Sequence, residues 1–403
     1  MGTKRHPIII KVILFIYVLY SFMPAVAYYV PSYIRIVLAL IVVFYFLPRV
    51  SFRWLPIIII PLLTLIGYAL NSPSRFFPHL YYVFNIGVLG ALSYSLVTRD
   101  EIALSRQIVV LLVISFVINS ITTLYGNIRF PNASRVLASI TLVAENYDNY
   151  RRQNIGGFDE IYSFTLSIPL AAIVFMKKKG ILRILSLSVA VLFLFTIIKS
   201  DYTTALVFAV LSFLLFFFPL KTKNRTIIIV ISLIVAFLLL GDSINVFSFI
   251  SRLSGSDAVS NRMSDLSDWL QSGQLNDNSD VSGRFGLYMI SLKGFLTSPI
   301  IGNLTSKETM VGGHSFILDN LSTYGLIGII SLLLMYSAIY NLNCKFYSKT
   351  DFFYFAIFIY VVYLFLTFLN PQPFIPFISF ALPLFFYVLS RDDYRSASLW
   401  NNQ

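Results

Sequence analysis

Residues 181–198 read ILRILSLSVAVLFLFTII, an apolar run interrupted by one charged side chain, Arg183. A helix of about 20 mostly apolar residues is long enough to cross a membrane. Similar runs recur along the whole chain, and together they predict about twelve transmembrane helices. The expected bounds are 8–28, 33–48, 54–70, 78–97, 105–124, 160–176, 181–198, 203–219, 226–241, 322–341, 351–369 and 373–390.

The composition of the chain agrees with this prediction. Of the 403 residues, 57% are hydrophobic and 12% are charged, and the mean hydropathy is +0.79. Globular proteins have about 25% charged residues, so an ordinary cytosolic enzyme is excluded, as is a disordered chain. A single cysteine, Cys344, excludes an internal disulfide and a thiolate metal cluster. We therefore expect an all-α polytopic membrane protein in which residues 1–403 form one integral membrane domain.

The distribution of positive charge predicts the orientation. Of the 30 Lys and Arg residues, eighteen fall in one set of alternate connections, whereas the other short connections hold only Arg35, Arg75 and Lys199. Cytoplasmic loops carry the excess of Lys and Arg, so both termini are expected in the cytoplasm. Topology thus explains much of the net charge of +12, and no nucleic-acid partner is predicted. The first span resembles a signal peptide, but its apolar run exceeds the usual core of about 7–15 residues, so we expect it to stay uncleaved.

Two long outside segments, 126–159 and 242–313, interrupt the pattern of short connections. Loops longer than about 15 residues are uncommon and tend to be functional or disordered. Within the second loop we expect amphipathic helices at 262–270 and 284–295 and a surface turn at 273–282. The nine remaining basic residues all lie in these two loops: Arg129, Arg135, Arg151, Arg152, Arg252, Arg262, Arg284, Lys293 and Lys307.

Some of these arginines are candidate ligand-binding residues. Arginine presents a planar fork of donors that suits phosphate or carboxylate groups. Glycines follow Arg151 and Arg152 and flank Arg284, and a glycine lets the backbone come close to a ligand. The alternative is that a long translocated loop tolerates positive charge without any function. The residues themselves leave both interpretations open.

His314 follows Gly312 and Gly313, where the second outside loop returns to the membrane. The glycine pair is expected to end the loop, and a helix is expected to begin near His314. Histidine is the usual general acid or base near neutral pH, so one interpretation is catalytic. The other is an ordinary polar side chain at the membrane interface.

Several kinds of site are missing from the sequence. No Asp or Glu lies in the middle of any expected span, because Asp159, Glu160 and Asp319 fall at span boundaries. Ion-coupled transporters normally need carboxylates within the membrane, so this class is disfavoured. The chain has no Walker loop and no GxGxxG motif, and its three histidines are scattered. We therefore predict no cofactor and no metal, and any phosphorylated energy donor must arrive as part of the substrate.

The run that starts at His314 fits the pattern His-[Asn/Ser/Gln], nine residues, then Gly-x-x-[Gly/Thr/Tyr]. Ser315, Gly325 and Gly328 are in register with it. This pattern resembles the superfamily of O-antigen ligases and O-antigen or capsular polysaccharide polymerases of bacterial envelopes. Ser315 replaces the commoner Asn of the pattern.

Two other runs are similar to elements of that superfamily. Residues 282–284 (SGR) followed by 298–302 (SPIIG) resemble the Gly-Arg … Pro-x-x-Gly element that precedes the histidine. The first outside loop ends at 156–162 with GGFDEIY, which looks more like the polymerase branch.

The resemblance implies a GT-C-like glycosyltransferase in the bacterial inner (cytoplasmic) membrane, with its active site outside the cytoplasm. Its implied substrate is an oligosaccharide linked to undecaprenyl diphosphate in the membrane lipid. A polymerase transfers the growing glycan from this carrier onto the next lipid-linked repeat unit. A ligase, the nearest alternative, transfers the finished glycan onto lipid A-core. A chain-length regulator and a flippase of the same pathway are implied as further partners.

Residue roles follow from the same resemblance. His314 and Arg284 are the expected catalytic residues, with His314 deprotonating or orienting the acceptor hydroxyl and Arg284 binding the diphosphate. The expected substrate-binding residues are Arg151, Arg152, Arg135, Gly313, Ser315 and Asp319. A flippase for lipid-linked oligosaccharides is a less favoured alternative, because it is expected to show two related halves and short outside loops.

Overall fold

The computed structural model describes residues 6–46, 52–71, 73–137, 144–217, 264, 280–303, 311–344, 353–371 and 374–400. Within these ranges every regular element is helical. The predicted span 226–241 and most of the second outside loop, including Arg252, Arg262 and Lys307, lie outside the described residues.

In chain order the described elements are α1 (Ile8–Phe22), α2 (Pro24–Tyr29), α3 (Ser32–Phe46), η2 (Phe52–Ile58), α4 (Ile59–Asn71), α5 (Pro73–Thr98), α6 (Ile102–Arg129), α7 (Ala133–Val136), α8 (Ala144–Arg152), α9 (Phe158–Lys177), α10 (Ile181–Ile198), α11 (Thr203–Leu214), η3 (Leu215–Phe217), α15 (Asp280–Thr297), α16 (Phe316–Asn343), α17 (Phe353–Leu369), η6 (Phe377–Ala381) and α18 (Leu382–Trp400).

Several of these helices have the length and composition of membrane spans. Among the described residues, five helical stretches are long and apolar enough to cross a membrane: His79–Thr98, Ile102–Arg129, Phe158–Lys177, Ile181–Ile198 and Phe316–Asn343. Six further apolar helices have 10–17 residues. The all-α membrane class predicted from composition is therefore supported, whereas the number of crossings stays a prediction.

The first predicted span, 8–28, is broken in the structure. Met23 has extended backbone angles (φ −123°, ψ 115°), and Pro24 starts the separate helix α2. Proline lacks the N–H that a continuing helix needs, and its ring pushes the preceding residue out of helical geometry. The break turns α2 away from α1 and lets it pack against α8, next to the first outside loop.

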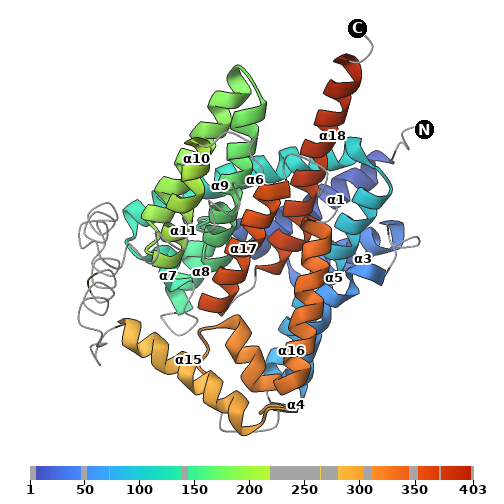
Figure 1. The fold of residues 1–403 in the computed structure, drawn as a ribbon. Coiled ribbons are helices and arrows are strands. Elements are labelled where there is room, and N and C mark those ends of the chain that lie inside the picture. The colour runs from blue at the N-terminus through green and yellow to red at the C-terminus, as the bar shows by residue number, and fades with distance from the viewer. Residues whose placement is uncertain are drawn as a thin grey trace.

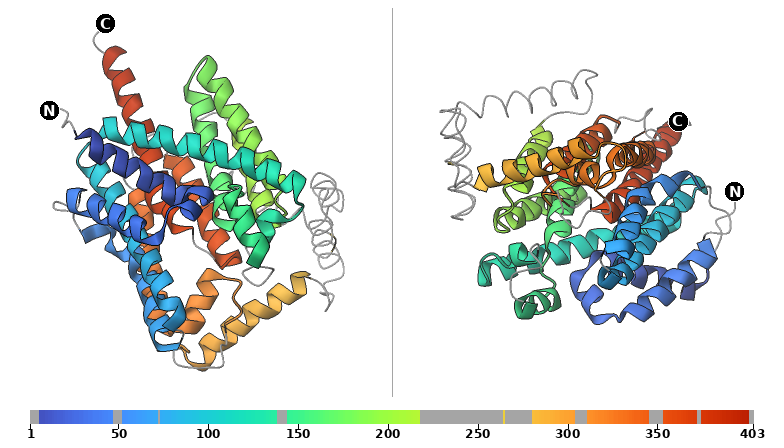
Figure 2. Two further views of the ribbon diagram at one scale, coloured as in Figure 1. Left: turned by 180° about the vertical axis from the view of Figure 1, so that it is seen from behind. Right: turned by 90° about the horizontal axis from the view of Figure 1, so that it is seen from below.

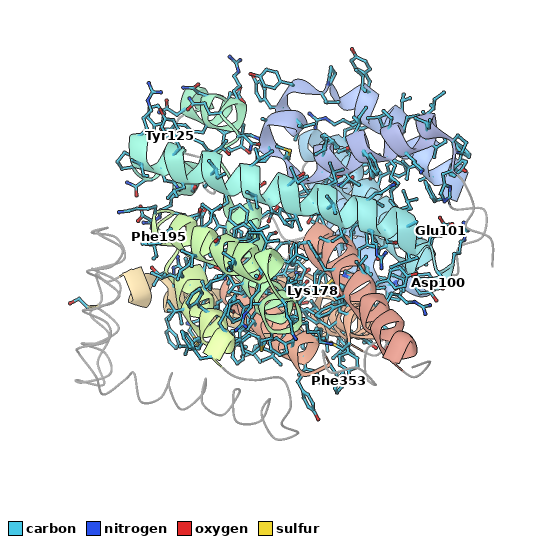
Figure 3. All side chains as sticks on the ribbon, turned by 90° about the horizontal axis from the view of Figure 1, so that it is seen from above. Asp100, Glu101, Tyr125, Lys178, Phe195 and Phe353 are labelled. Atoms are coloured by element: carbon cyan, nitrogen blue, oxygen red, sulfur yellow. The ribbon has the colours of Figure 1, made fainter. Side chains whose placement is uncertain are left out.

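The two ends of the helix bundle carry different segments of the chain. Figure 1 shows both termini on the opposite side of the molecule from α7, α8 and α15. Figure 2 shows the same separation from behind. In Figure 3, α6 runs across the molecule from Asp100 and Glu101 at one end to Tyr125 near the other. Segments expected inside and outside the cell thus lie at different ends of the bundle.

Helix α16 is kinked at Gly325, which has a positive φ of 56°. The turn at 299–302 packs against the helix at this kink, where the N–H of Leu326 donates to the carbonyl of Pro299 at 2.7 Å. A Cβ atom added to Gly325 would lie 2.7 Å from backbone atoms of that turn, and one added to Gly302 would lie 2.3 Å from the carbonyl oxygen of Thr323. These glycines of the sequence motif therefore allow two segments of this chain to meet, rather than a ligand to approach.

Candidate functional site

The site is built around the start of α16, where the expected helix does begin beside His314. Ser315 is the N-cap, and its hydroxyl oxygen accepts a hydrogen bond from the N–H of Leu318 at 3.1 Å. The carboxylate of Asp319 accepts from the N–H of Ser315 at 3.1 Å and from the N–H of Gly313 at 3.2 Å. A side chain that caps a helix in this way satisfies backbone donors that the helix leaves free. Ser315 and Asp319 thus fix the turn that carries His314.

Ser291 joins this turn to α15. Its hydroxyl donates to Asp319 at 2.6 Å and accepts from the N–H of Gly312 at 2.8 Å. Ser291 is fully buried, so water does not compete for these bonds. The sequence analysis missed this residue, although Arg284, Tyr288 and Ser291 follow the i, i+4, i+7 spacing that places side chains on one helix face.

Asn370, just after α17, connects three further helices at the same place. Its backbone carbonyl accepts from the N–H of Phe316 at 2.8 Å, and its side-chain oxygen accepts from the hydroxyl of Tyr162 at 3.0 Å. Next to it, the hydroxyl of Tyr288 donates to the carbonyl of Leu369 at 3.0 Å. The end of α17 therefore holds α9, α15 and α16 together around His314. A single buried Asn gave no sequence pattern by which to find it.

Arg284 and His314 are brought together from two segments thirty residues apart. Partial burial lowers the pKa of His314 below its ordinary value of 6.5, the charge of Arg284 lowers it further, and Asp319 acts in the opposite direction. The charge of Arg284 also acts on the hydroxyls of Tyr288 and Tyr162. Both His314 and Arg284 are half-buried, and neither forms a hydrogen bond or ion pair with another described residue. Their polar atoms are available to a ligand.

An aromatic cluster lies next to this pair. It consists of Phe158, Tyr162, Tyr202 and Phe374, and we call it the aromatic cluster below. The ring of Tyr162 lies 4.5 Å from that of Phe158, 5.2 Å from that of Phe374 and 5.9 Å from that of Tyr202. Arg135, in the last turn of α7, acts electrostatically on Tyr202. The predicted binding residue Arg135 and the predicted catalytic residue Arg284 thus each act on a tyrosine of this cluster.

Arg151 and Arg152 form a second group on α8. The guanidinium of Arg152 donates to the hydroxyl of Tyr28 at 2.6 Å and lies 4.9 Å from the centre of its ring. Arg151 lies 5.7 Å from the centre of the Tyr147 ring and acts electrostatically on Glu160. These two arginines therefore have protein partners of their own, unlike Arg284.

The glycines near the site differ in their surroundings. A Cβ atom added to Gly312 would lie 2.1 Å from the carbonyl oxygen of Leu287, so this glycine serves the contact between the turn and α15. Among the residues that the structure describes, none lies within 4 Å of a Cβ atom added to Gly313, which has φ +74°, or to Gly283. Space for a ligand to approach the backbone is thus present at Gly313 and Gly283, and not at Gly312.

No group of three or more His, Cys, Asp or Glu side chains among the described residues could hold a metal ion. No model of a known protein family matches the chain, and no curated protein matches it.

Proposed function

We propose that this protein is a polysaccharide polymerase of the bacterial envelope, with a GT-C-like architecture of about twelve membrane spans. It transfers a growing glycan from undecaprenyl diphosphate onto the next lipid-linked repeat unit, at the outer face of the inner membrane. The motifs around Arg284, Gly302 and His314 suggest this superfamily, and the run that ends the first outside loop favours the polymerase over the ligase.

The observation that carries the proposal is the pairing of Arg284 with His314. A half-buried guanidinium without a partner among the described residues is suited to a dianionic diphosphate, which it can bind through two parallel hydrogen bonds. A histidine whose pKa lies below 6.5 is neutral at pH 7, which is the form that accepts a proton. Both groups come from segments that the Ser291 and Asn370 hydrogen bonds hold in place.

The reaction follows from this arrangement. The acceptor hydroxyl attacks the anomeric carbon of the donor sugar, and its proton passes to the imidazole of His314. The bond between that carbon and the diphosphate oxygen breaks, and the lipid diphosphate leaves with the electron pair. Arg284 stabilises the negative charge that grows on this leaving group. Holding donor and acceptor in one site supplies much of the remaining rate enhancement.

The envelope glycan of a strain that lacks the protein tests this proposal. A polymerase predicts that long polymer disappears while single repeat units remain attached to their final acceptor. Complete loss of attached glycan, with polymer left on the carrier lipid, would indicate a ligase instead. Unchanged polymer length would contradict both activities.

A further inference from the structure

The first outside loop lines an open cavity of about 190 Å³ that the proposed reaction has not used. It lies between α8 and the first turn of α9. Its walls include Tyr147 and Arg151 on one side and Phe158, Asp159 and Glu160 on the other. Pro24, which the break after α1 brings to this place, also lines it. Ligand pockets for drug-sized molecules measure about 300–1,000 Å³, so this cavity suits a smaller group.

Asp159, which lines this cavity, has one carboxyl oxygen that forms no hydrogen bond with a described residue. Its Oδ1 atom is buried and has no hydrogen-bond partner among the described residues. The neighbouring Glu160 differs, because its Oε2 atom accepts from the N–H of Gly157 at 2.8 Å. A buried acceptor without a partner is costly, and nearly all such groups in proteins are satisfied. The free oxygen of Asp159 therefore calls for a donor from a ligand.

The other walls indicate what that ligand is. Arg151 supplies donors, and the rings of Tyr147 and Phe158 supply apolar faces. A sugar ring combines hydroxyl donors and acceptors on its rim with apolar C–H faces, so it matches all three kinds of wall. A diphosphate fits poorly, because its oxygens only accept hydrogen bonds and offer no donor to the unpartnered Oδ1 atom of Asp159.

We infer that this cavity binds one sugar ring of the lipid-linked glycan, with Asp159 accepting a hydrogen bond from a ring hydroxyl. The inference rests on the proposed function and adds a glycan subsite to it. The ring of Phe158 lies 4.5 Å from that of Tyr162, and the charge of Arg284 acts electrostatically on the hydroxyl of Tyr162. Phe158 thus belongs both to the cavity wall and to the aromatic cluster that adjoins Arg284, and in this subsite Arg151 binds sugar.

A cysteine at Leu137, which also lines the cavity, reports on its occupancy. The purified Leu137→Cys protein is treated with a maleimide in the presence of lipid-linked repeat units extracted from the deletion strain, or of undecaprenyl diphosphate alone. The glycan-bearing lipid should slow labelling at least about 10-fold, and the bare carrier should not. The substitution Asp159→Asn in the same protein should remove this protection, whereas Asp148→Asn, at an exposed position of α8, should preserve it.

Activity gives a second readout that needs no cysteine. Asp159→Asn keeps the shape of the side chain and replaces one acceptor oxygen by an NH2 donor, so polymer formation from purified lipid-linked repeat units should fall about 10- to 100-fold. Asp148→Asn should leave it unchanged. Equal protection by the bare carrier, no protection at all, or full activity of Asp159→Asn would overturn the subsite. Each of these results can occur while the deletion strain still loses its polymer, so the two proposals fail separately.

Discussion

Ser291 provides a sharp test of how the site is held, because it contacts neither proposed reacting group. The substitution Ser291→Ala removes the hydroxyl that donates to Asp319 at 2.6 Å and accepts from the N–H of Gly312 at 2.8 Å. A hydrogen bond to a charged group contributes about 1.5–3 kcal/mol and a neutral one about 1 kcal/mol. The turn before α16 thus loses about 2–4 kcal/mol of anchoring to α15.

The expected consequence is a loss of rate. A displacement of about 1 Å in a reacting group can cost on the order of 100-fold in rate, so polymer formation by Ser291→Ala should fall about 10- to 100-fold. Because Ser291 is not placed in the substrate path, the loss should appear in kcat and leave KM for the lipid-linked repeat unit nearly unchanged.

The assay uses purified protein in lipid vesicles with extracted lipid-linked repeat units, and it follows polymer length on a gel. Lys293→Ala, an exposed position on the same helix, is the matched control and should retain wild-type activity. If Ser291→Ala keeps more than half of the wild-type kcat at a normal protein level, the anchoring of His314 through α15 is refuted.

Three other predictions concern the same end of the bundle. Arg284→Lys keeps the charge but loses the planar fork, so it should fail nearly as badly as Arg284→Ala in the gel assay; full activity would reduce Arg284 to a general electrostatic contributor. Gly325→Ala places a methyl group 2.7 Å from backbone atoms at a residue with φ +56°, so either membrane-inserted protein should be lost on immunoblots or activity should be lost on gels. The control Gly286→Ala has open space around the added methyl group among the described residues and should be tolerated. Because the pKa of His314 lies below 6.5, activity should stay constant from neutral pH down to about pH 6.5 and fall at lower pH, where the imidazole becomes protonated. A fall in activity that begins above pH 7 would contradict this.

Composition was enough to predict the helical class, and the apolar runs along the sequence predicted most helix positions. The predicted stretch 181–198 coincides with α10, and the amphipathic stretch predicted at 284–295 lies within α15. The first prediction holds because a long, mostly apolar stretch in a membrane must satisfy its backbone hydrogen bonds internally, which favours a helix. The break at Met23 was missed, although Pro24 was visible, because hydropathy alone does not register the missing N–H of a proline.

The arrangement of the site was less predictable. The start of α16 at Phe316 was expected from the glycine pair, but the roles of Ser291 and Asn370 depend on contacts between distant helices, which one sequence does not encode in any pattern. Sequence also grouped Arg151 with Arg284 as diphosphate ligands. In the structure Arg151 lines the same cavity as Asp159 and Glu160, a surrounding that the charge of the loop alone did not predict.

The central claim is that His314 accepts the proton of the acceptor hydroxyl, and paired substitutions of this residue test it most directly. His314→Ala and His314→Gln are compared for polymer formation from purified lipid-linked repeat units, at equal amounts of membrane-inserted protein. A general base contributes about 10²–10⁴-fold in rate, and glutamine forms hydrogen bonds without basicity. The account predicts that both variants lose long polymer. Near-normal activity of His314→Gln would leave His314 as an acceptor-positioning group, and normal activity of His314→Ala would contradict its role in the reaction altogether.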